Sequence, residues 1–176
     1  MKAHESHRES AVADLGFYVI TVSSSRFAKR RDGKRFRDES GDLAEEIIEK
    51  NKHRVVGREL IDDDKEMVAA SLNGALTKEG VDVVVFTGGT GVSPRDVTVD
   101  AVRPLFEKEI EGFGELMRAV SYAKIGSPAM LSRTTAGLKS GKLILCLPGS
   151  PDGVDTGLNL FIGDIPHVVY VARKRG

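Results

Sequence analysis

Short apolar runs alternate with stretches of helical periodicity along most of the chain. The pattern predicts four strands, at residues 16–22, 54–61, 81–86 and 143–147. The first and last of these are continuous apolar runs, not alternating ones, which is typical of strands buried on both faces of a parallel sheet.

Apolar positions three and four residues apart predict the helices. We expect them at residues 42–52, 64–77, 97–111, 115–123, 151–161 and 165–172. Ser40 is the expected N-cap of the first, and Ser150 followed by Pro151 is a typical opening for the fifth. The glycines at 112 and 114 are expected to separate the third helix from the fourth.

The order of these elements predicts the fold class. Strands that alternate with helices and lack tight hairpin turns indicate a mostly parallel sheet covered by helices on both faces, a doubly wound α/β arrangement. A length of 176 residues favours a single domain, which we place at residues 15–176. Residues 1–14 have no apolar period and are expected to form a flexible tail.

Composition narrows the class of protein. The 26 Lys and Arg residues balance the 26 Asp and Glu residues, so no overall charge draws the chain to nucleic acid or to anionic lipid. No apolar run approaches the ~20 residues that span a bilayer, and the N-terminus lacks the apolar core of a signal peptide. The single Cys146 excludes an internal disulfide and a cysteine-built zinc site. We therefore expect a cytoplasmic protein without a membrane or nucleic-acid partner.

Three loops directly follow predicted strands, at residues 23–25, 87–91 and 148–151. The carboxyl ends of parallel strands share one edge of a sheet, where ligands of α/β folds bind. Each loop combines hydroxyl donors with a backbone that can turn its N–H groups outward, and this composition suits oxyanions.

The second loop is the most informative. Three glycines in five positions allow positive φ and let a ligand approach the main chain, while Thr and Arg side chains supply donors for phosphate. The candidate binding residues in and behind this loop are Thr87, Gly88, Gly89, Thr90, Gly91, Ser93 and Arg95. The loop matches neither a Walker A sequence nor G-x-G-x-x-G, so an ordinary strand-to-helix turn remains the alternative.

Asp63 and Asp96 are the candidate metal ligands. Both follow a predicted strand or precede a predicted helix, on the expected ligand edge. One or two carboxylates together with phosphate oxygens are the usual ligands of Mg²⁺. The alternative for Asp63, within an aspartate run, is an acid that complements a helix N-terminus.

Residues 26–37 form a strongly basic segment, with seven Lys or Arg residues and Asp32 as the only acid. A mobile lid that carries positive charge over a polyanionic substrate is one interpretation. A nucleic-acid patch is opposed by the zero net charge, and a solvated loop is the third interpretation.

These motifs together resemble the family of molybdenum cofactor biosynthesis proteins that includes MoaB and MogA, and they are similar to the G domain of gephyrin. The stretches that carry the resemblance are TGGTG (87–91), SPRDVT (93–98), GFGELMR (112–118), LSR (131–133) and LPGSP (147–151). The resemblance extends over residues 16–172, and the short length is most like the MoaB branch.

The resemblance implies a three-layer α/β/α sandwich that assembles into trimers or hexamers. It also implies adenylylation of molybdopterin by Mg²⁺-ATP, with Asp63 and Asp96 matching the two functionally important aspartates of the family. The loop at 87–91 and the residues Pro148, Gly149 and Ser150 match its molybdopterin-binding elements. The chain departs from the family at Ser24, where an Asp is frequent, and in its basic segment, and both departures bear on the ATP side of the site.

Our hypothesis from the sequence is therefore a molybdopterin adenylyltransferase. Its substrates are ATP and molybdopterin, Mg²⁺ is the cofactor, and Asp63 and Asp96 carry catalysis. The product would pass to a downstream protein that inserts molybdate, or tungstate in an organism that uses tungsten. The alternative is a carrier or scaffold protein of the same pathway that binds molybdopterin without turnover.

Overall fold

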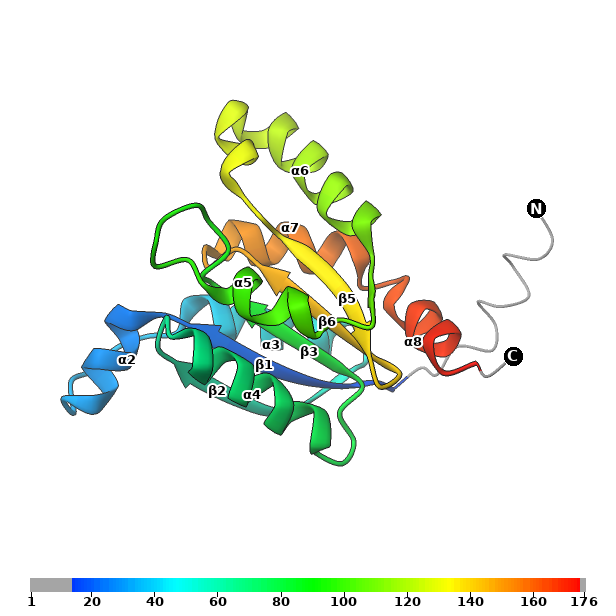
Figure 1. Cartoon of the computed structure of the whole chain (residues 1–176), viewed down its shortest axis with the longest axis horizontal. Helices are drawn as coiled ribbons and strands as arrows, with labels where there is room; N and C mark the ends of the chain where they lie inside the picture. The colour runs from blue at the N-terminus through cyan, green and yellow to red at the C-terminus, as the bar shows by residue number, and fades with distance from the viewer. Residues whose placement is uncertain (1–13, 175–176) are drawn as a thin grey trace.

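The computed structural model describes residues 14–174, which form a six-stranded sheet with helices on both faces (Figure 1). The strand order is β2-β1-β3-β6-β5-β4. The first four strands in that order are parallel, and β5 and β4 extend the sheet in antiparallel fashion. The strands are β1 Gly16–Val22, β2 Arg54–Ile61, β3 Val83–Thr87, β4 Lys108–Glu109, β5 Thr135–Lys139 and β6 Lys142–Leu147.

Helices cover the two faces of the sheet and make it the middle of three layers. One face packs against α3, α7, α8 and the start of α6, and the other packs against α4 and α5. The helices are α2 Ser24–Arg31, α3 Glu39–Lys50, α4 Lys65–Thr77, α5 Thr98–Val102, α6 Glu111–Ile125, α7 Pro151–Phe161 and α8 Ile165–Arg173, with 3₁₀ turns η1 Arg103–Leu105 and η2 Ser127–Leu131. The predicted α/β/α sandwich with a mostly parallel sheet is confirmed.

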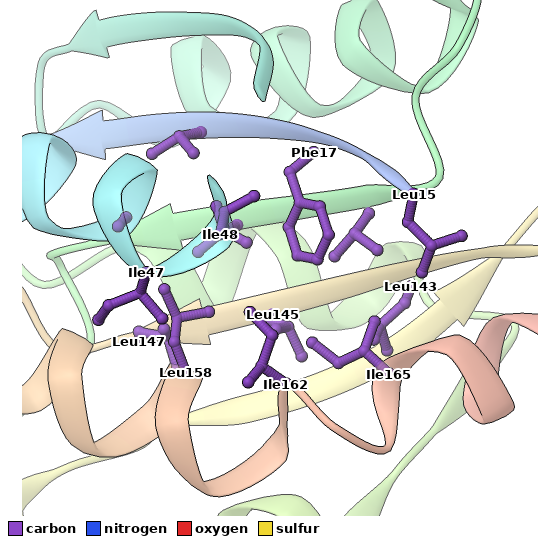
Figure 2. Close-up of a cluster of buried hydrophobic side chains, with 14 of the residues drawn as sticks. Leu15, Phe17, Ile47, Ile48, Leu143, Leu145, Leu147, Leu158, Ile162 and Ile165 are labelled. Atoms are coloured by element: carbon purple, nitrogen blue, oxygen red, sulfur yellow. The ribbon is translucent and has the colours of Figure 1, made fainter. Parts of the chain in front are cut away.

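Alternation along the central strands divides the apolar side chains between two cores. In β1, Phe17 and Val19 point to one core and Ile20 to the other, as the period of two in a strand requires. Figure 2 shows the first core, in which Phe17 lies among leucines and isoleucines from β6, α3 and α7. Burial of each such side chain stabilises the fold by about 1.5–3 kcal/mol.

Cys146 lies in β6 and is fully buried in the second core. Desolvation by burial raises the pKa of its thiol. The residue is therefore a small core side chain and not a nucleophile, as its apolar surroundings in the sequence predict.

The prediction that tight hairpins are absent is wrong. Strands β5 and β6 are joined by a two-residue turn at Ser140 and Gly141, which have φ of +52° and +70°. Positive φ at both central positions is typical of the type I′ turn that suits the twist of paired strands. Strands β4 and β5 are not among the predicted strands, and β4 has only two residues, too few to show any period.

The helices predicted around Gly112 and Gly114 are also corrected. The expected helix at 97–111 ends early, because α5 gives way to the η1 turn at Pro104, and the chain then enters the sheet as β4. The glycines do not break a helix, since α6 runs through both of them. A Cβ on Gly114 would lie 2.7 Å from the carbonyl oxygen of Thr134, so this glycine permits close packing against the chain that leads into β5.

Two further expectations change at the start of α3 and in the basic segment. Asp38, not Ser40, caps α3, and its carboxylate accepts a hydrogen bond from the Gly41 amide. The first part of the basic segment is helical, because α2 begins at Ser24 and is capped by Ser23. The predicted tail lies almost entirely outside the described residues. Within residues 14–174, no helix is long and apolar enough to cross a bilayer.

Candidate functional site

A cavity of about 560 Å³ opens at the carboxyl ends of the parallel strands. Thr21, Thr87 and Leu147 stand side by side across β1, β3 and β6, so the loops after these strands emerge together. Most of the predicted site residues line this cavity, namely Asp63, Gly88, Gly89, Thr90, Gly91, Arg95, Asp96, Pro148, Gly149 and Ser150. Thr87 and Ser93 are not among the residues that line it.

Pro128, Leu131 and Ser132 also line the cavity, although none of them is among the binding residues predicted from the sequence. All three come from the segment around η2, which follows no parallel strand. The Ser132 hydroxyl is buried and has no hydrogen-bond partner among the described residues. A buried hydroxyl normally has a partner, so a ligand in this cavity is a natural source of one.

The glycine loop has a backbone that only glycine adopts easily. Gly88 has φ of +104° and Gly89 has φ of +65°, and a Cβ on Gly88 would collide with the carbonyl oxygen of Val22. The Thr98 hydroxyl donates to the Gly88 carbonyl at 2.8 Å, and the Thr98 amide donates to the Gly89 carbonyl at 3.0 Å. The first half of the loop is thereby fixed between β1 and the start of α5.

Thr87 lies beneath this loop. It is the last residue of β3 and is fully buried. Its hydroxyl lies 3.5 Å from the hydroxyls of Thr21 and Ser40. Thr87 therefore supports the loop from below and does not line the cavity, whereas Thr90 and the glycines do.

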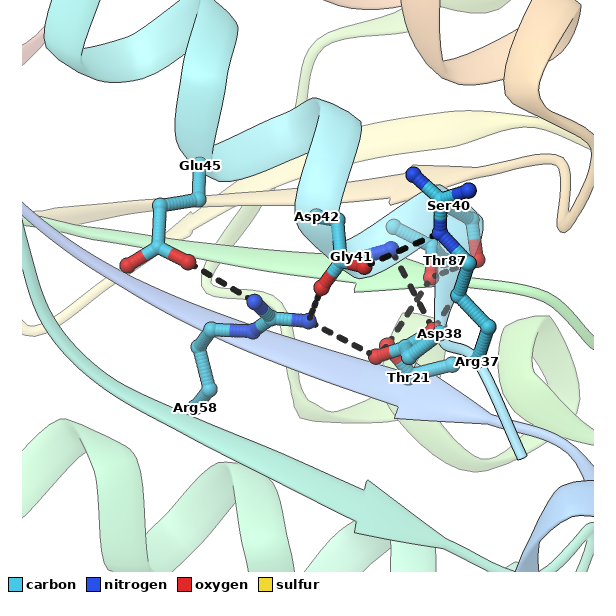
Figure 3. A network of polar contacts seen from close by, with 9 residues as sticks. All are labelled: Thr21, Arg37, Asp38, Ser40, Gly41, Asp42, Glu45, Arg58 and Thr87. Atoms are coloured by element: carbon cyan, nitrogen blue, oxygen red, sulfur yellow. Dashed lines mark hydrogen bonds and ion pairs between the residues drawn. The ribbon is translucent and has the colours of Figure 1, made fainter. Parts of the chain in front are cut away.

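The support continues into a charged network between β2 and α3 (Figure 3). Asp38 accepts hydrogen bonds from Thr21 at 2.8 Å and from Arg58 at 3.0 Å. Partial burial would lower the pKa of Arg58, but hydrogen bonds to Asp42, Glu45 and Asp38 raise it. The network therefore ties the end of β1, through Thr21, and the strand β2, through Arg58, to the start of α3.

The carboxylate of Asp63 is oriented by Ser24. Its Oδ2 accepts hydrogen bonds from the Ser24 amide at 2.7 Å and the Ser24 hydroxyl at 2.8 Å. The neighbouring Asp64 is the N-cap of α4 and accepts from Met67 at 2.8 Å. The helix-capping role that the sequence left open for Asp63 thus belongs to Asp64. The Ser24 hydroxyl therefore donates directly to a candidate metal ligand.

The carboxylate of Asp96 is held in a tight turn. Its Oδ2 accepts from the Ser93 amide at 2.9 Å, which is the contribution of Ser93 to the site. Among the described residues, hydrogen bonds engage only Oδ2 in Asp63 and in Asp96. Each carboxylate therefore keeps one oxygen for a ligand in the cavity.

The donor set fits a hard cation. Asp63 and Asp96 offer oxygen alone, and Mg²⁺ needs only one or two carboxylates when phosphate and water complete its shell. Within residues 14–174, no cluster of three or more His, Cys, Asp or Glu side chains forms an all-protein metal site. The arrangement suits a cation that arrives with a phosphorylated substrate.

Two arginines contribute positive charge to the lining of the cavity. Arg26 and Arg95 both line it, and no carboxylate in the described part of the chain pairs with either. Helix α2 continues outward from Arg26 and buries none of its residues (Figure 1). The site thus combines two carboxylates, a glycine-rich backbone and cationic side chains around one hollow.

Comparison with known proteins gives a consistent result. Residues 18–167 match the family described as "Probable molybdopterin binding domain". The chain is 37% identical over 171 residues to molybdenum cofactor biosynthesis protein B of Bacillus cereus, covering 96% of this chain and 97% of that protein. It is 40% identical over 175 residues to the molybdopterin adenylyltransferase of Pyrococcus furiosus, covering 97% and 98%. The crystal structure of the tungsten cofactor synthesizing protein MoaB from P. furiosus superimposes with a TM-score of 0.81 at 39% identity, covering 93% of this chain and all of that one.

Proposed function

The chain belongs to the family of molybdopterin-binding domains, and we propose from this that it is a molybdopterin adenylyltransferase. A phosphate oxygen of molybdopterin attacks the α-phosphorus of ATP. The bond from that phosphorus to the bridging oxygen breaks, and pyrophosphate leaves. The observation that carries the proposal is the cavity in which Asp63 and Asp96 face the glycine loop. The name of the P. furiosus relative, at 40% identity over nearly the full length, supports the same reaction.

Reactions of this kind depend on positioning and on neutralising charge. We assign phosphate binding to the backbone of Gly88 to Gly91 and to the turn at Pro148 to Ser150, which opens α7. The two loops touch, because a Cβ on Gly149 would lie only 3.0 Å from the Gly88 Cα. The amide groups at the start of α7 favour an anion.

Asp63 and Asp96 would hold Mg²⁺ with their unengaged oxygens. When bound there, Mg²⁺ neutralises negative charge on the triphosphate. Arg26 and Arg95 add positive charge to the lining of the cavity, which favours a triphosphate there. The Ser132 hydroxyl is a further donor to a bound substrate.

We also propose that the protein works in the cytoplasm as a homo-oligomer, a trimer or a hexamer, and hands its product to a molybdate- or tungstate-inserting protein. Exposed apolar side chains gather on α6 and η2, which supports an interface there. They are Leu116, Tyr122, Ile125, Met130 and Leu131. The free, buried Cys146 suits a reducing compartment.

The test is a transfer assay with the purified protein, molybdopterin, Mg²⁺ and ATP labelled at the α-phosphate. Label on the pterin, with one pyrophosphate released per label transferred, is the expected result. Tight binding of molybdopterin with no transfer would overturn the enzymatic proposal and support the carrier. Loss of both binding and transfer would leave a scaffold role.

The contribution of Arg26, which lines the cavity, can be separated from that of the basic residues farther along α2. We expect Arg26→Gln to raise the KM for ATP by roughly tenfold or more, because a hydrogen bond to a charged group contributes about 1.5–3 kcal/mol. Replacement of Lys29, Arg30 and Arg31 together by Gln should leave kcat/KM within about threefold, since these side chains are exposed on the outward part of α2. Steady-state kinetics at fixed ionic strength measures both. An equal loss in the triple variant would show that the whole helix acts as a lid.

A further inference from the structure

Arg133 lies between η2 and β5, next to the cavity of the proposed site. It lines a neighbouring cavity of about 950 Å³, and Ser132, the residue before it, lines both cavities. Its side chain is about one-third exposed, and the guanidinium donates two hydrogen bonds to the backbone of the glycine loop and the segment behind it. Nε donates to the Gly91 carbonyl at 2.6 Å, and Nη2 donates to the Asp96 carbonyl at 2.5 Å.

A bidentate ion pair fixes the same guanidinium from the other side. Nη1 and Nη2 lie 2.9 Å from the two carboxylate oxygens of Asp100. This contact lowers the pKa of Asp100 and raises the pKa of Arg133, because each charged group stabilises the other. Four of the five N–H donors of the arginine are thus engaged. The side chain therefore has one N–H left, too little for a bidentate contact with a phosphate.

The two halves of the loop are held by different residues. Thr98 holds Gly88 and Gly89, as described above. In the described part of the chain, the hydrogen bonds that fasten Thr90, Gly91 and Asp96 to residues outside the loop all come from Arg133, whose amide also donates to the Thr90 carbonyl at 2.8 Å. Residues 92–95 between these points are exposed.

We propose that Arg133 is a positioning residue that fixes the segment 91–96 and so keeps the Asp96 carboxylate directed into the cavity. It acts through Asp96 and does not touch the substrate. Its effect on turnover rests on the proposed function, whereas its effect on the loop does not. The planar fork is essential, because a lysine has the charge but cannot reach two carbonyls and a carboxylate at once.

Arg103 provides a matched control. It lines the same second cavity and makes an ion pair with Glu109 at 2.8 Å, from an exposed position. Its hydrogen bond goes to Glu109 and not to the glycine loop. Arg103→Ala therefore removes one arginine from this cavity and leaves the loop fastened.

The first measurement is amide hydrogen exchange on the full chain for wild type, Arg133→Lys, Arg133→Ala and Arg103→Ala. We expect the Ser93 and Asp96 amides, which are bonded within the segment, to exchange at least tenfold faster in both Arg133 variants. The Thr98 amide should stay within threefold of wild type, and Arg103→Ala should change none of them. Unchanged exchange in Arg133→Lys would overturn the proposal. Should Arg133→Ala not fold, Asp100→Asn removes the ion pair more gently and is expected to accelerate the same two amides.

The second measurement separates binding from turnover. Both Arg133 variants are expected to lower kcat for AMP transfer at least tenfold and to leave the Kd for molybdopterin within threefold. A Lys variant that retains wild-type kcat would show that charge alone suffices and would overturn the role of the fork. If wild type itself transfers no label, the proposed function fails, and the exchange experiment still decides the role of Arg133.

Discussion

Asp63→Asn and Asp96→Asn should each lower AMP transfer by roughly 10²–10³-fold, the loss expected when one preorganised electrostatic contribution is removed from a reaction centre. Asn keeps the size of the side chain and one oxygen, so the hydrogen bonds from Ser24 or Ser93 can persist. What disappears is one negative charge at the proposed Mg²⁺ site. We therefore expect a lower kcat and a higher Mg²⁺ concentration for half-maximal activity, with folding unchanged.

Asp64→Asn is the matched control for this pair. Asp64 is adjacent to Asp63 but does not line the cavity, and its carboxylate caps α4. Asn caps helices about as well as Asp, so transfer should remain within about twofold of wild type. The transfer assay at saturating ATP, repeated over a series of Mg²⁺ concentrations, measures all three variants. Wild-type rates in either Asp63→Asn or Asp96→Asn would remove that residue from the metal site.

The sequence predicted the four parallel strands because each carries enough apolar or β-branched residues to show its own pattern. β1, β2 and α7 have the predicted bounds, and the Ser150–Pro151 opening of α7 is a local signal that needs no tertiary contact. β4 and β5 are different, since β4 is defined only by its pairing with β5. The Ser140–Gly141 turn between β5 and β6 is readable in principle, because a Ser-Gly pair is a turn signal.

Most of the cavity lining, apart from Pro128, Leu131 and Ser132, followed from one rule, that loops after parallel strands share an edge of the sheet. The residues that hold the glycine loop in place could not be predicted from that rule. The sequence predicts Thr87 in the loop, because the predicted third strand ends at Phe86. Its pairing with Thr21 and Leu147 instead places it in the sheet. Arg133 approaches the loop from a segment that follows no parallel strand, so no local pattern identifies its partners.

The basic segment shows the limit of reading charge along a chain. Seven cationic residues in twelve positions indicate a solvated segment, and α2 indeed buries none of its residues. The charges do not reveal that the first part of the segment is a helix. The helix begins at Ser24, whose amide and hydroxyl bind Asp63. A tertiary contact with the candidate metal ligand thus fixes where the helix starts.

Gly88→Ala is expected to destabilise the fold by about 2–5 kcal/mol, because two costs add. A positive φ costs an L-residue roughly 1–2 kcal/mol, and a methyl group forced into a packed site costs about 1–3 kcal/mol more. Here φ is +104°, and the added Cβ would collide with the carbonyl oxygen of Val22, a backbone atom of β1 that is held between β2 and β3 and cannot swing aside. The expected fall in Tm is roughly 5–20 °C for a chain of this size.

Gly74→Ala separates this effect from the general consequence of replacing a glycine. Gly74 lies within α4, and a Cβ there would meet no atom within 4 Å. Ala in a helix is more favourable than Gly by about 0.5–1 kcal/mol, so this variant should be slightly more stable than wild type. Urea unfolding followed by circular dichroism gives both values on one scale.

Gly88→Ala should also lose molybdopterin binding below its melting temperature, because the loop backbone must move to accommodate the methyl group. If Gly88→Ala is as stable as wild type and still binds molybdopterin, the loop is not held tightly against β1. The assignment of phosphate binding to the backbone of this loop would then be wrong.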